Sequence, residues 1–203
     1  MAKKAYVYNG NAWEDLASSV SDLSSYATTV DLDDYQLKSV AGLTLINTTT
    51  FTTSANVVVS NVFTSNYNNY LVVGNYTISS AGTFIFARVS ASGTPLTANY
   101  ATVSQRIRSD AGATILQTST TGMQMGSGSN YSTAGSFTLN VNNPFASART
   151  FFTGLQSVRE EDTLNYGFNF SGQTTNTTSY DGFALAPAAG TTSGTIRIYG
   201  LRD

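Results

Sequence analysis

The stretch YLVVGNYTISSAGTFIFARV, from Tyr70 to Val89, decides the fold class of this chain. Two apolar runs, Tyr70–Ile78 and Thr83–Val89, flank the polar residues 79–82 (SSAG). β-Branched and aromatic side chains favour strands, whereas serine and glycine favour turns. The stretch therefore predicts two β-strands joined by a short turn.

Similar runs recur along the rest of the chain, at Ala55–Phe63, Ser136–Val141, Arg149–Leu155, Leu164–Phe170, Gly182–Ala186 and Thr195–Leu201. Turn-forming residues separate them, at 92–95, 110–112, 142–144 and 191–194. Short strands at this spacing, without helical patterns between them, are typical of an antiparallel β-sandwich, here predicted as a jelly-roll-like head over residues 42–203. In the last strand we expect Ile196 and Ile198 to face one way and Arg197 and Tyr199 the other. Alternation likewise places Arg106 and Arg108 on the solvent face of their strand.

Composition supports an all-β chain and excludes several kinds of site. Charged residues make up 11% of the 203 residues, against about 25% in typical soluble domains. Serine, threonine and asparagine together form about a third of the chain, above their ordinary usage. The chain has neither cysteine nor histidine, which excludes disulfides, cysteine nucleophiles, histidine bases and the common zinc and haem sites.

Charge and hydropathy narrow the expected partners. The net charge is −2 and no basic stripe stands out, so we expect no nucleic-acid partner. No apolar run reaches the roughly 20 residues of a membrane span, so we expect no membrane insertion. The first residues, MAKKAYVYNG, lack the apolar run of a secretory signal, as expected of a protein assembled in the cytoplasm.

The N-terminal stretch AYVYNGNAWEDL, residues 5–16, predicts a small hairpin. Asn9-Gly10 is a strong two-residue turn signal. A hairpin this short is marginally stable alone in water. We therefore expect its aromatic residues Tyr6, Tyr8 and Trp13 to dock onto a partner, because aromatic anchors are enriched at interfaces. The alternative is that Trp13 packs on the surface of the main domain.

Residues 21–40 repeat an Asp-Leu…Tyr pattern twice, and Asp22 and Asp31 can each cap a short helical turn. One heptad seam would contain Leu23, Tyr26, Val30, Leu37 and Val40. So short a helix is unstable alone, and would persist if several chains packed these faces together. The repeat thus predicts a stalk formed by several chains over residues 21–41; the alternative is an irregular linker.

Two stretches carry a resemblance to a known family. Asn61–Tyr100 opens with VFTSNYNNY and continues into an x-Arg-apolar strand that ends before a tyrosine; Gly194–Asp203 reads GTIRIYGLRD. Both resemble the head domain of many bacteriophage fibre and minor tail proteins, and YVYNGNAWEDLASSV with the repeat is similar to the tip and stalk of phage tail fibres. The resemblance implies a homotrimeric virion fibre in which residues 1–20 anchor the chain to other virion proteins. A stalk this short, spanning about 30 Å, suits a short fibre.

The sequence shows no catalytic signature, and we expect no enzyme, cofactor or metal site. The carboxylates of the head are Asp110, Glu160, Glu161, Asp162, Asp181 and Asp203. None forms a recognisable facing acid/base pair of the kind glycosidases need. Glycan binding is the rival to a structural role, because tyrosines beside loops can stack on sugars. The candidates are Tyr67, Tyr70, Tyr100, Tyr131 and Tyr180, which could equally be trimer contacts or half-buried tyrosines. The alternative function is a monomeric carbohydrate-binding adhesin module.

Overall fold

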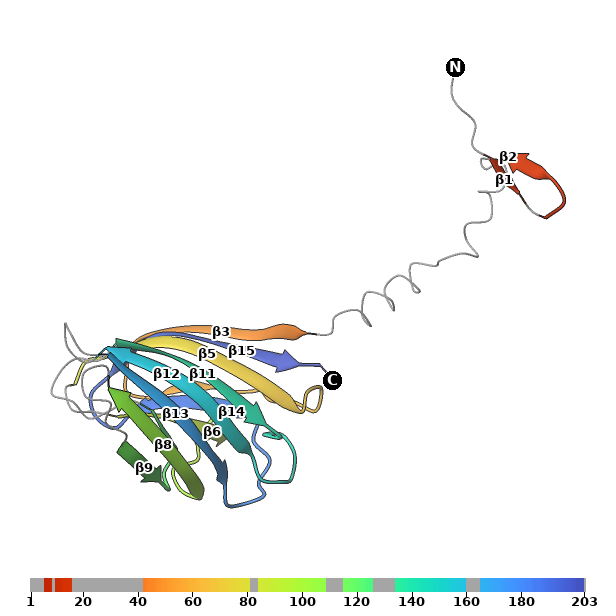
Figure 1. Cartoon of the computed structure of the whole chain (residues 1–203). Coiled ribbons are helices and arrows are strands. Elements are labelled where there is room, and N and C mark those ends of the chain that lie inside the picture. The colour runs from red at the N-terminus through yellow and green to blue at the C-terminus, as the bar shows by residue number, and fades with distance from the viewer. Residues whose placement is uncertain are drawn as a thin grey trace. The chain divides into compact units, whose positions relative to one another are not determined.

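The computed structural model of the chain describes residues 6–8, 10–15, 42–80, 84–108, 115–125, 134–159 and 165–202. The chain divides into two units, Met1–Ala41 and Gly42–Asp203, and each is described here by itself. The described residues form strands and no helix (Figure 1). The predicted stalk residues Leu23, Tyr26, Val30, Leu37 and Val40 lie outside the described residues.

The first unit contains the predicted hairpin. Strand β1 (Tyr6–Tyr8) pairs antiparallel with β2 (Trp13–Asp15), and Tyr8 lies opposite Trp13. Residues 10–12 all lie between the two strands, so the connection is longer than the two-residue turn predicted at Asn9-Gly10. Gly10 has a φ of 97°, in the region that glycine adopts without strain.

The second unit, which we call the head, is built on an eight-stranded antiparallel sheet. Its strand order is β3-β15-β5-β11-β12-β13-β8-β9. The strands are β3 (Leu43–Ser54), β15 (Thr192–Leu201), β5 (Asn69–Ile78), β11 (Ala134–Asn142), β12 (Phe151–Arg159), β13 (Asn165–Thr174), β8 (Tyr100–Arg108) and β9 (Ile115–Ser119). Figure 1 shows them as one curved layer from β3 to β9.

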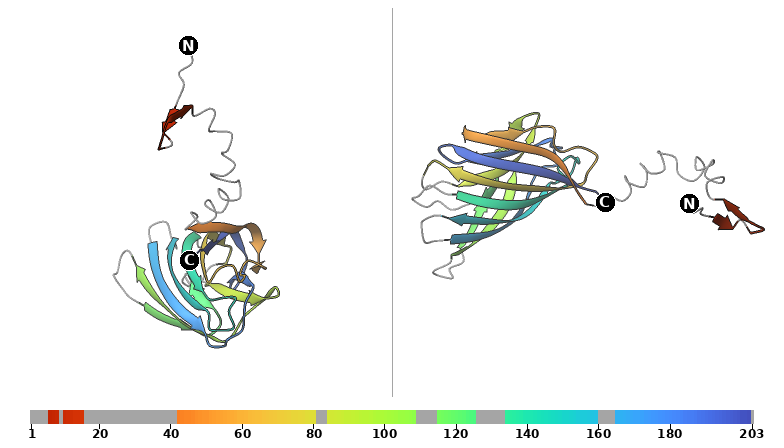
Figure 2. Two further views of the ribbon diagram at one scale, coloured as in Figure 1. Left: turned by 90° about the vertical axis from the view of Figure 1, so that its right-hand side faces the viewer. Right: turned by 90° about the horizontal axis from the view of Figure 1, so that it is seen from above.

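A smaller, five-stranded sheet packs against this layer. Four of its strands follow the order β10 (Met123–Met125), β6 (Ile85–Ala91), β14 (Gly182–Pro187) and β4 (Val57–Val59), and β7 (Thr94–Pro95) pairs with β6. The turned views in Figure 2 show the larger sheet curving around the smaller one. The mainly β, antiparallel two-sheet architecture is confirmed, although the strand count departs from the eight strands of a jelly roll.

One hydrophobic core lies between the two sheets, and strict alternation supplies it. In β13 every second residue is buried, from Tyr166 through Phe168 to Phe170. In β15 Ile196 and Ile198 are fully buried while Arg197 is exposed, as predicted. Fully burying a large apolar side chain contributes about 1.5–3 kcal/mol, so this alternation fixes the register of each strand.

Inward-facing glycines and aromatic rings are paired across neighbouring strands. Gly74 of β5 lies opposite Phe137 of β11, and a Cβ atom at Gly74 would lie 2.7 Å from that ring. Gly154 lies opposite Phe170 in the same way. Each ring occupies the space that the glycine leaves open, so the inner layer is close-packed.

Several strands were not foreseen from the sequence. Strands β3, β8, β9 and β10 were not predicted individually, and residues 191–194 were expected to be a turn. Thr192–Gly194 instead begin β15, where the pairing with β3 is irregular between Thr192 and Gly194. The extra residue lies in β3, where Thr53 has a φ of 50°.

The first and last strands of the head are neighbours. Leu43 at the start of β3 lies opposite Leu201 at the end of β15, and the Arg202 amide donates to the Gly42 carbonyl oxygen at 3.4 Å. The chain therefore enters and leaves the head at the same end of the sheet.

Candidate interaction face

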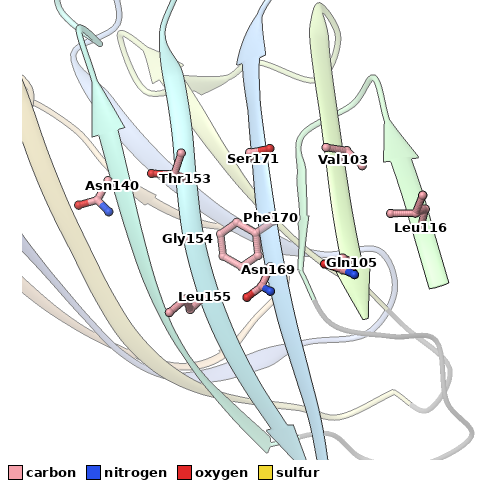
Figure 3. Close-up of a pocket in the computed structure, with 10 residues that line it drawn as sticks. All are labelled: Val103, Gln105, Leu116, Asn140, Thr153, Gly154, Leu155, Asn169, Phe170 and Ser171. Atoms are coloured by element: carbon pink, nitrogen blue, oxygen red, sulfur yellow. The ribbon is translucent and has the colours of Figure 1, made fainter. Parts of the chain in front are cut away.

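The side of the larger sheet that turns away from the core presents a broad surface built by five strands: β11, β12, β13, β8 and β9. We call this surface the outer face. Its side chains alternate with the buried ones, as in β12, where residues 151, 153, 155, 157 and 159 are exposed. Figure 3 shows side chains from all five strands lying side by side across it.

The strand register arranges these side chains in rows across the sheet. One row, whose apolar members are Leu155 and Leu116, consists of Thr138, Leu155, Asn169, Gln105 and Leu116. The next row consists of Asn140, Thr153, Ser171, Val103 and Thr118. Apolar side chains are thus interspersed with amides and hydroxyls.

Five apolar side chains of the outer face are unusually exposed. The exposed fractions are 70% for Leu116, 61% for Leu155, 46% for Ile107 and for Phe151, and 40% for Val103. Single exposed leucines are normal on protein surfaces, whereas a group on one face marks an interaction site. Exposure on this scale makes the outer face a candidate interaction surface.

The outer face is also almost free of charge. In the described parts of these five strands, Arg159, at the end of β12, is the only charged residue that faces outward. The cores of protein–protein interfaces are depleted of charge in the same way.

Three open hollows cross this side of the larger sheet. The first has a volume of about 480 Å³ and shares Leu155 and Asn169 with a second of about 400 Å³ (Figure 3). The second shares Ser136 and Ser157 with a third of about 610 Å³, which extends over β5 and β15. Gly167 deepens the second hollow, because nothing lies within 4 Å of the position its Cβ would take. The hollows form one continuous trough.

The chemistry of the outer face is limited to apolar contact and neutral hydrogen bonding. Asp181 is the only carboxylate in the described part of the head, and its Oδ1 accepts a hydrogen bond from the Ser92 amide at 3.0 Å. No group of three metal-ligating side chains occurs among the described residues. The other carboxylates of the head lie outside the described residues.

Three of the predicted glycan contacts are wrong, because their rings lie in the core. Tyr70, Tyr100 and Tyr180 are each at most 2% exposed. The Tyr70 hydroxyl donates to the Thr64 carbonyl oxygen at 2.8 Å, and the Tyr180 hydroxyl donates to Asn176 Oδ1 at 2.7 Å. Their polar ends satisfy loop groups, so the rings cannot stack on a sugar.

Tyr67 is half-buried. Its ring packs edge-on against Tyr70, 5.8 Å between centroids, and fills the space above Gly200. A hydrogen bond with Thr44 lowers the pKa of Tyr67, burial opposes this shift, and Arg202 lowers the pKa further. Its position ties β15 to the loop before β5 rather than presenting a free ring.

The remaining predicted site residues stay untested. Tyr131 lies outside the described residues. In the hairpin, Tyr8 is 53% exposed, and Tyr6 and Trp13 belong to β1 and β2. The structure brings these three residues into one paired element.

The expectation that Arg106 marks the solvent face of its strand is wrong. In β8 the inward positions include Thr102 and Ser104, both buried, while Ile107 is exposed. Arg106 shares the inward set, and its guanidinium lies 5.1 Å from the centre of the Tyr166 ring. A cation can lie on an aromatic ring at the end of a core, and here it covers that ring.

The residues of the outer face were missed because β8 reverses the usual pattern. Thr102, Ser104 and Arg106 take inward positions, whereas the apolar Val103 and Ile107 face outward. The available signal was that Leu116 and Leu155 occur at positions whose neighbours of the same parity are polar. Alternation alone cannot say which side of such a strand faces water.

No protein-family model matches this chain, and no curated protein matches it significantly. No helix in the described part of the chain is long and apolar enough to cross a membrane.

Proposed function

We propose that this protein is a non-enzymatic structural fibre protein of a bacteriophage virion, attached to the tail, whose heads associate as a homotrimer through the outer face. It contributes to host attachment or to tail assembly. The observation that carries the proposal is the group of exposed apolar side chains on a face with one peripheral charge.

A second copy of the same head is the occupant that the outer face suits best. An uncharged surface meets its own copy without the repulsion that like charges would cause. Specific interfaces bury about 800 Å² per partner, and a broad sheet face offers contact on this scale. Its hydroxyl and amide groups can bond to the same groups of a copy at the rim.

The other parts of the proposal concern the N-terminal unit. Residues 1–20 anchor the chain to other virion proteins through Tyr6, Tyr8 and Trp13, and residues 21–41 form a helical, three-chain stalk. The paired hairpin supports the anchor, because so small an element needs a docking partner to persist. We propose in addition that the head is jelly-roll-like and that the protein is located in the virion.

The native mass of the purified protein tests the proposal, measured by light scattering for the full chain and for residues 42–203. We expect a trimer for the full chain, and a trimer for the head alone if the outer face suffices. If the full chain is a monomer at micromolar concentration, the fibre proposal fails.

A charge placed on the outer face provides the matched variant. Leu116→Glu with Leu155→Glu puts two carboxylates into each copy of the contact, and we expect at least a tenfold weaker association. Phe145→Glu is the control, because Phe145 is also exposed, at 40%, but lies in the connection between β11 and β12. Equal association of both variants would remove the outer face from the proposal.

A monomeric carbohydrate-binding adhesin is the second candidate. Asn140, Gln105 and Asn169 line one hollow with amides that can bond to sugar hydroxyls. A monomeric full chain that binds host glycans, and loses binding on Asn169→Ala, would favour this function.

A further inference from the structure

Arg88 lies on a different surface, the side of the smaller sheet that turns away from the core. It is in β6, directly opposite Ala184 of β14. Its neighbours in β6, Ala87 and Val89, are buried in the core, so Arg88 points outward. Neither the trough nor the outer face includes it.

The Arg88 side chain is held in one orientation. Its Nε donates to the Thr121 carbonyl oxygen at 2.8 Å, and the guanidinium carbon lies 4.8 Å from the centre of the Phe86 ring. Gly122 makes room for the stem, because a Cβ there would lie 3.1 Å from Arg88 Cγ. The hydrogen bond fixes the Nε side of the guanidinium, and the Phe86 ring fixes its plane. The edge formed by the two Nη groups is left to bind a ligand.

This guanidinium is partly desolvated without a counter-charge among the described residues. Burial lowers the pKa of Arg88, and the neighbouring Tyr100 offsets only part of this effect. Asp181, the one described carboxylate of the head, is bound to the Ser92 amide. Partly burying a cation is unfavourable unless an anion or hydrogen bonds compensate. The site therefore favours an anionic group that can meet both Nη atoms.

Neutral hydrogen-bonding groups lie next to this cation. Gln124 of β10 is opposite Phe86 on the same surface, diagonal to Arg88. Its Nε2 donates to Gln117 Oε1 at 3.2 Å, which leaves the Gln124 carbonyl and the Gln117 amide nitrogen for a ligand. A cation flanked by amides suits a ligand that combines one anionic group with hydroxyls.

We propose that Arg88, Gln124 and Gln117 form a binding site for an acidic sugar, whose carboxylate or phosphate bonds to the Arg88 guanidinium and whose hydroxyls bond to the glutamines. Arginine binds planar carboxylates and phosphates with two parallel hydrogen bonds. The site does not depend on the proposed virion role, since a head of any oligomeric state would present it.

The test follows the Arg88 Nε–H signal of the full-length protein in ¹⁵N–¹H spectra. The probes are sodium glucuronate, glucose 6-phosphate, glucose, and sodium chloride at matched ionic strength. We expect a saturable shift of this signal with a Kd of about 1–10 mM for an acidic probe, the range of a weak single-group contact. Glucose and chloride should give no saturable shift. Glucuronate alone would identify a carboxylate ligand, and glucose 6-phosphate alone a phosphate ligand.

Variants separate the site from general electrostatics. The Arg88 variants lack the Arg88 Nε–H signal, so in them probe binding is followed by the side-chain amide signal of Gln124. Arg88→Gln should weaken binding of the acidic probe at least tenfold, and Arg88→Lys about tenfold, because an ammonium lacks the planar fork. Gln124→Ala retains Arg88 and its contact with Phe86, so it tests the site if Arg88→Gln fails to fold; we expect several-fold weaker binding. Arg197→Gln is the matched control, because Arg197 is an exposed arginine of β15 in the other sheet, and binding should be unchanged.

Two results would overturn the proposal. One is that no acidic probe shifts the Arg88 signal, or that Gln124→Ala and Arg197→Gln weaken binding of the probe equally. The other is a folded Arg88→Gln variant with reduced native mass, since the counter-charge of Arg88 would then come from a second copy. The outer-face variants Leu116→Glu and Leu155→Glu leave Arg88 intact, so failure of self-association and failure of sugar binding are distinguishable.

Discussion

Individual glycines set the thickness of the inner layer of the larger sheet. Gly154 of β12 faces the Phe170 ring and the Thr138 carbonyl oxygen, and a Cβ atom there would overlap both. Gly167 of β13 faces outward into open space. The same residue type therefore serves packing at one position and surface shape at the other.

A pair of alanine substitutions tests this difference. Gly154→Ala should lower the free energy of unfolding by about 1–3 kcal/mol, because the backbone oxygen of Thr138 cannot move aside cheaply. Gly167→Ala should be neutral or stabilise by up to about 1 kcal/mol through the unfolded chain. Denaturant unfolding of both variants at one protein concentration measures the difference, and equal effects would contradict the packing assignment.

Tyr100 connects the two sheets through one buried hydrogen bond. Its hydroxyl, in β8, accepts from the Val89 amide of β6 at 3.0 Å. Tyr100→Phe leaves that amide unpaired, so we expect the free energy of unfolding to fall by about 1–3 kcal/mol at neutral pH. Tyr199→Phe, in the half-buried outward position of β15, is the control and should change stability by less.

Alkaline pH should reduce the contribution of Tyr100. Burial raises the pKa of Tyr100 well above its ordinary value. The folded state then retains a proton that the unfolded chain releases near pH 10, so stability is complete below that pH and falls above it. From pH 10 to pH 11 the stability difference between wild type and Tyr100→Phe should narrow by about 1 kcal/mol. A constant difference in urea titrations over this range would show that Tyr100 ionises normally.

At the level of single residues, the sequence predicted the alternation of buried and exposed side chains in β15. It did not predict that three tyrosines would be buried. Tyr70, Tyr100 and Tyr180 occur beside turn-forming residues, and an amphipathic ring is equally suited to a loop surface or a core. The Tyr100 hydroxyl bonds to the Val89 amide in the other sheet, and the Tyr70 hydroxyl bonds to loop backbone. Such partners are fixed by tertiary packing, which local sequence does not encode.

Position within the sheet distinguishes the strands of the larger sheet. Strands β5, β11 and β12 pair with a neighbour on both sides, whereas β3 and β9 are its two edges. An edge strand presents unpaired amides and carbonyls on one side. The edges should therefore open more readily than the centre.

Native-state hydrogen exchange of residues 42–203 measures this order. We expect the slowest amides in β11 and β12 and exchange at least tenfold faster in β9, because local opening requires less free energy at an edge. The slow amides of β11 are the internal reference within the same sample. Protection in β9 equal to that in β11 would show that its open edge is covered.

The strands themselves were mostly predictable, and their partners were not. Long apolar runs such as Tyr70–Ile78 identified β5 directly. Strand β8 was missed because Thr102, Ser104 and Arg106 give it no apolar inward side, and β10 because Met123 and Met125 lie beside a glycine-rich stretch. The order that places β15 between β3 and β5 joins segments more than a hundred residues apart, and no periodicity in the sequence encodes that choice.

On the scale of the whole molecule, the two sheets present chemically different surfaces to the outside, the outer face and the Arg88 surface. The larger sheet offers an apolar, nearly uncharged area suited to a copy of itself, and the smaller sheet offers a fixed cation. The low charged fraction of the sequence predicts weakly charged surfaces. It could not locate them, because the side of each strand that meets solvent is decided by which sheets pack together.

The pairing of Leu43 with Leu201 has a consequence for how such a head can be rearranged. With Gly42 and Arg202 in hydrogen-bonding distance, the fold is close to a closed ring, and joining the two ends would need only a short linker. Circular permutants opened at the exposed Ser92–Gly93 turn should therefore keep the same sandwich. Adjacent ends also suit domain insertion. Recombination can insert the head into a surface loop of an unrelated protein, because the two junctions would be neighbours and the backbone of neither protein would be distorted.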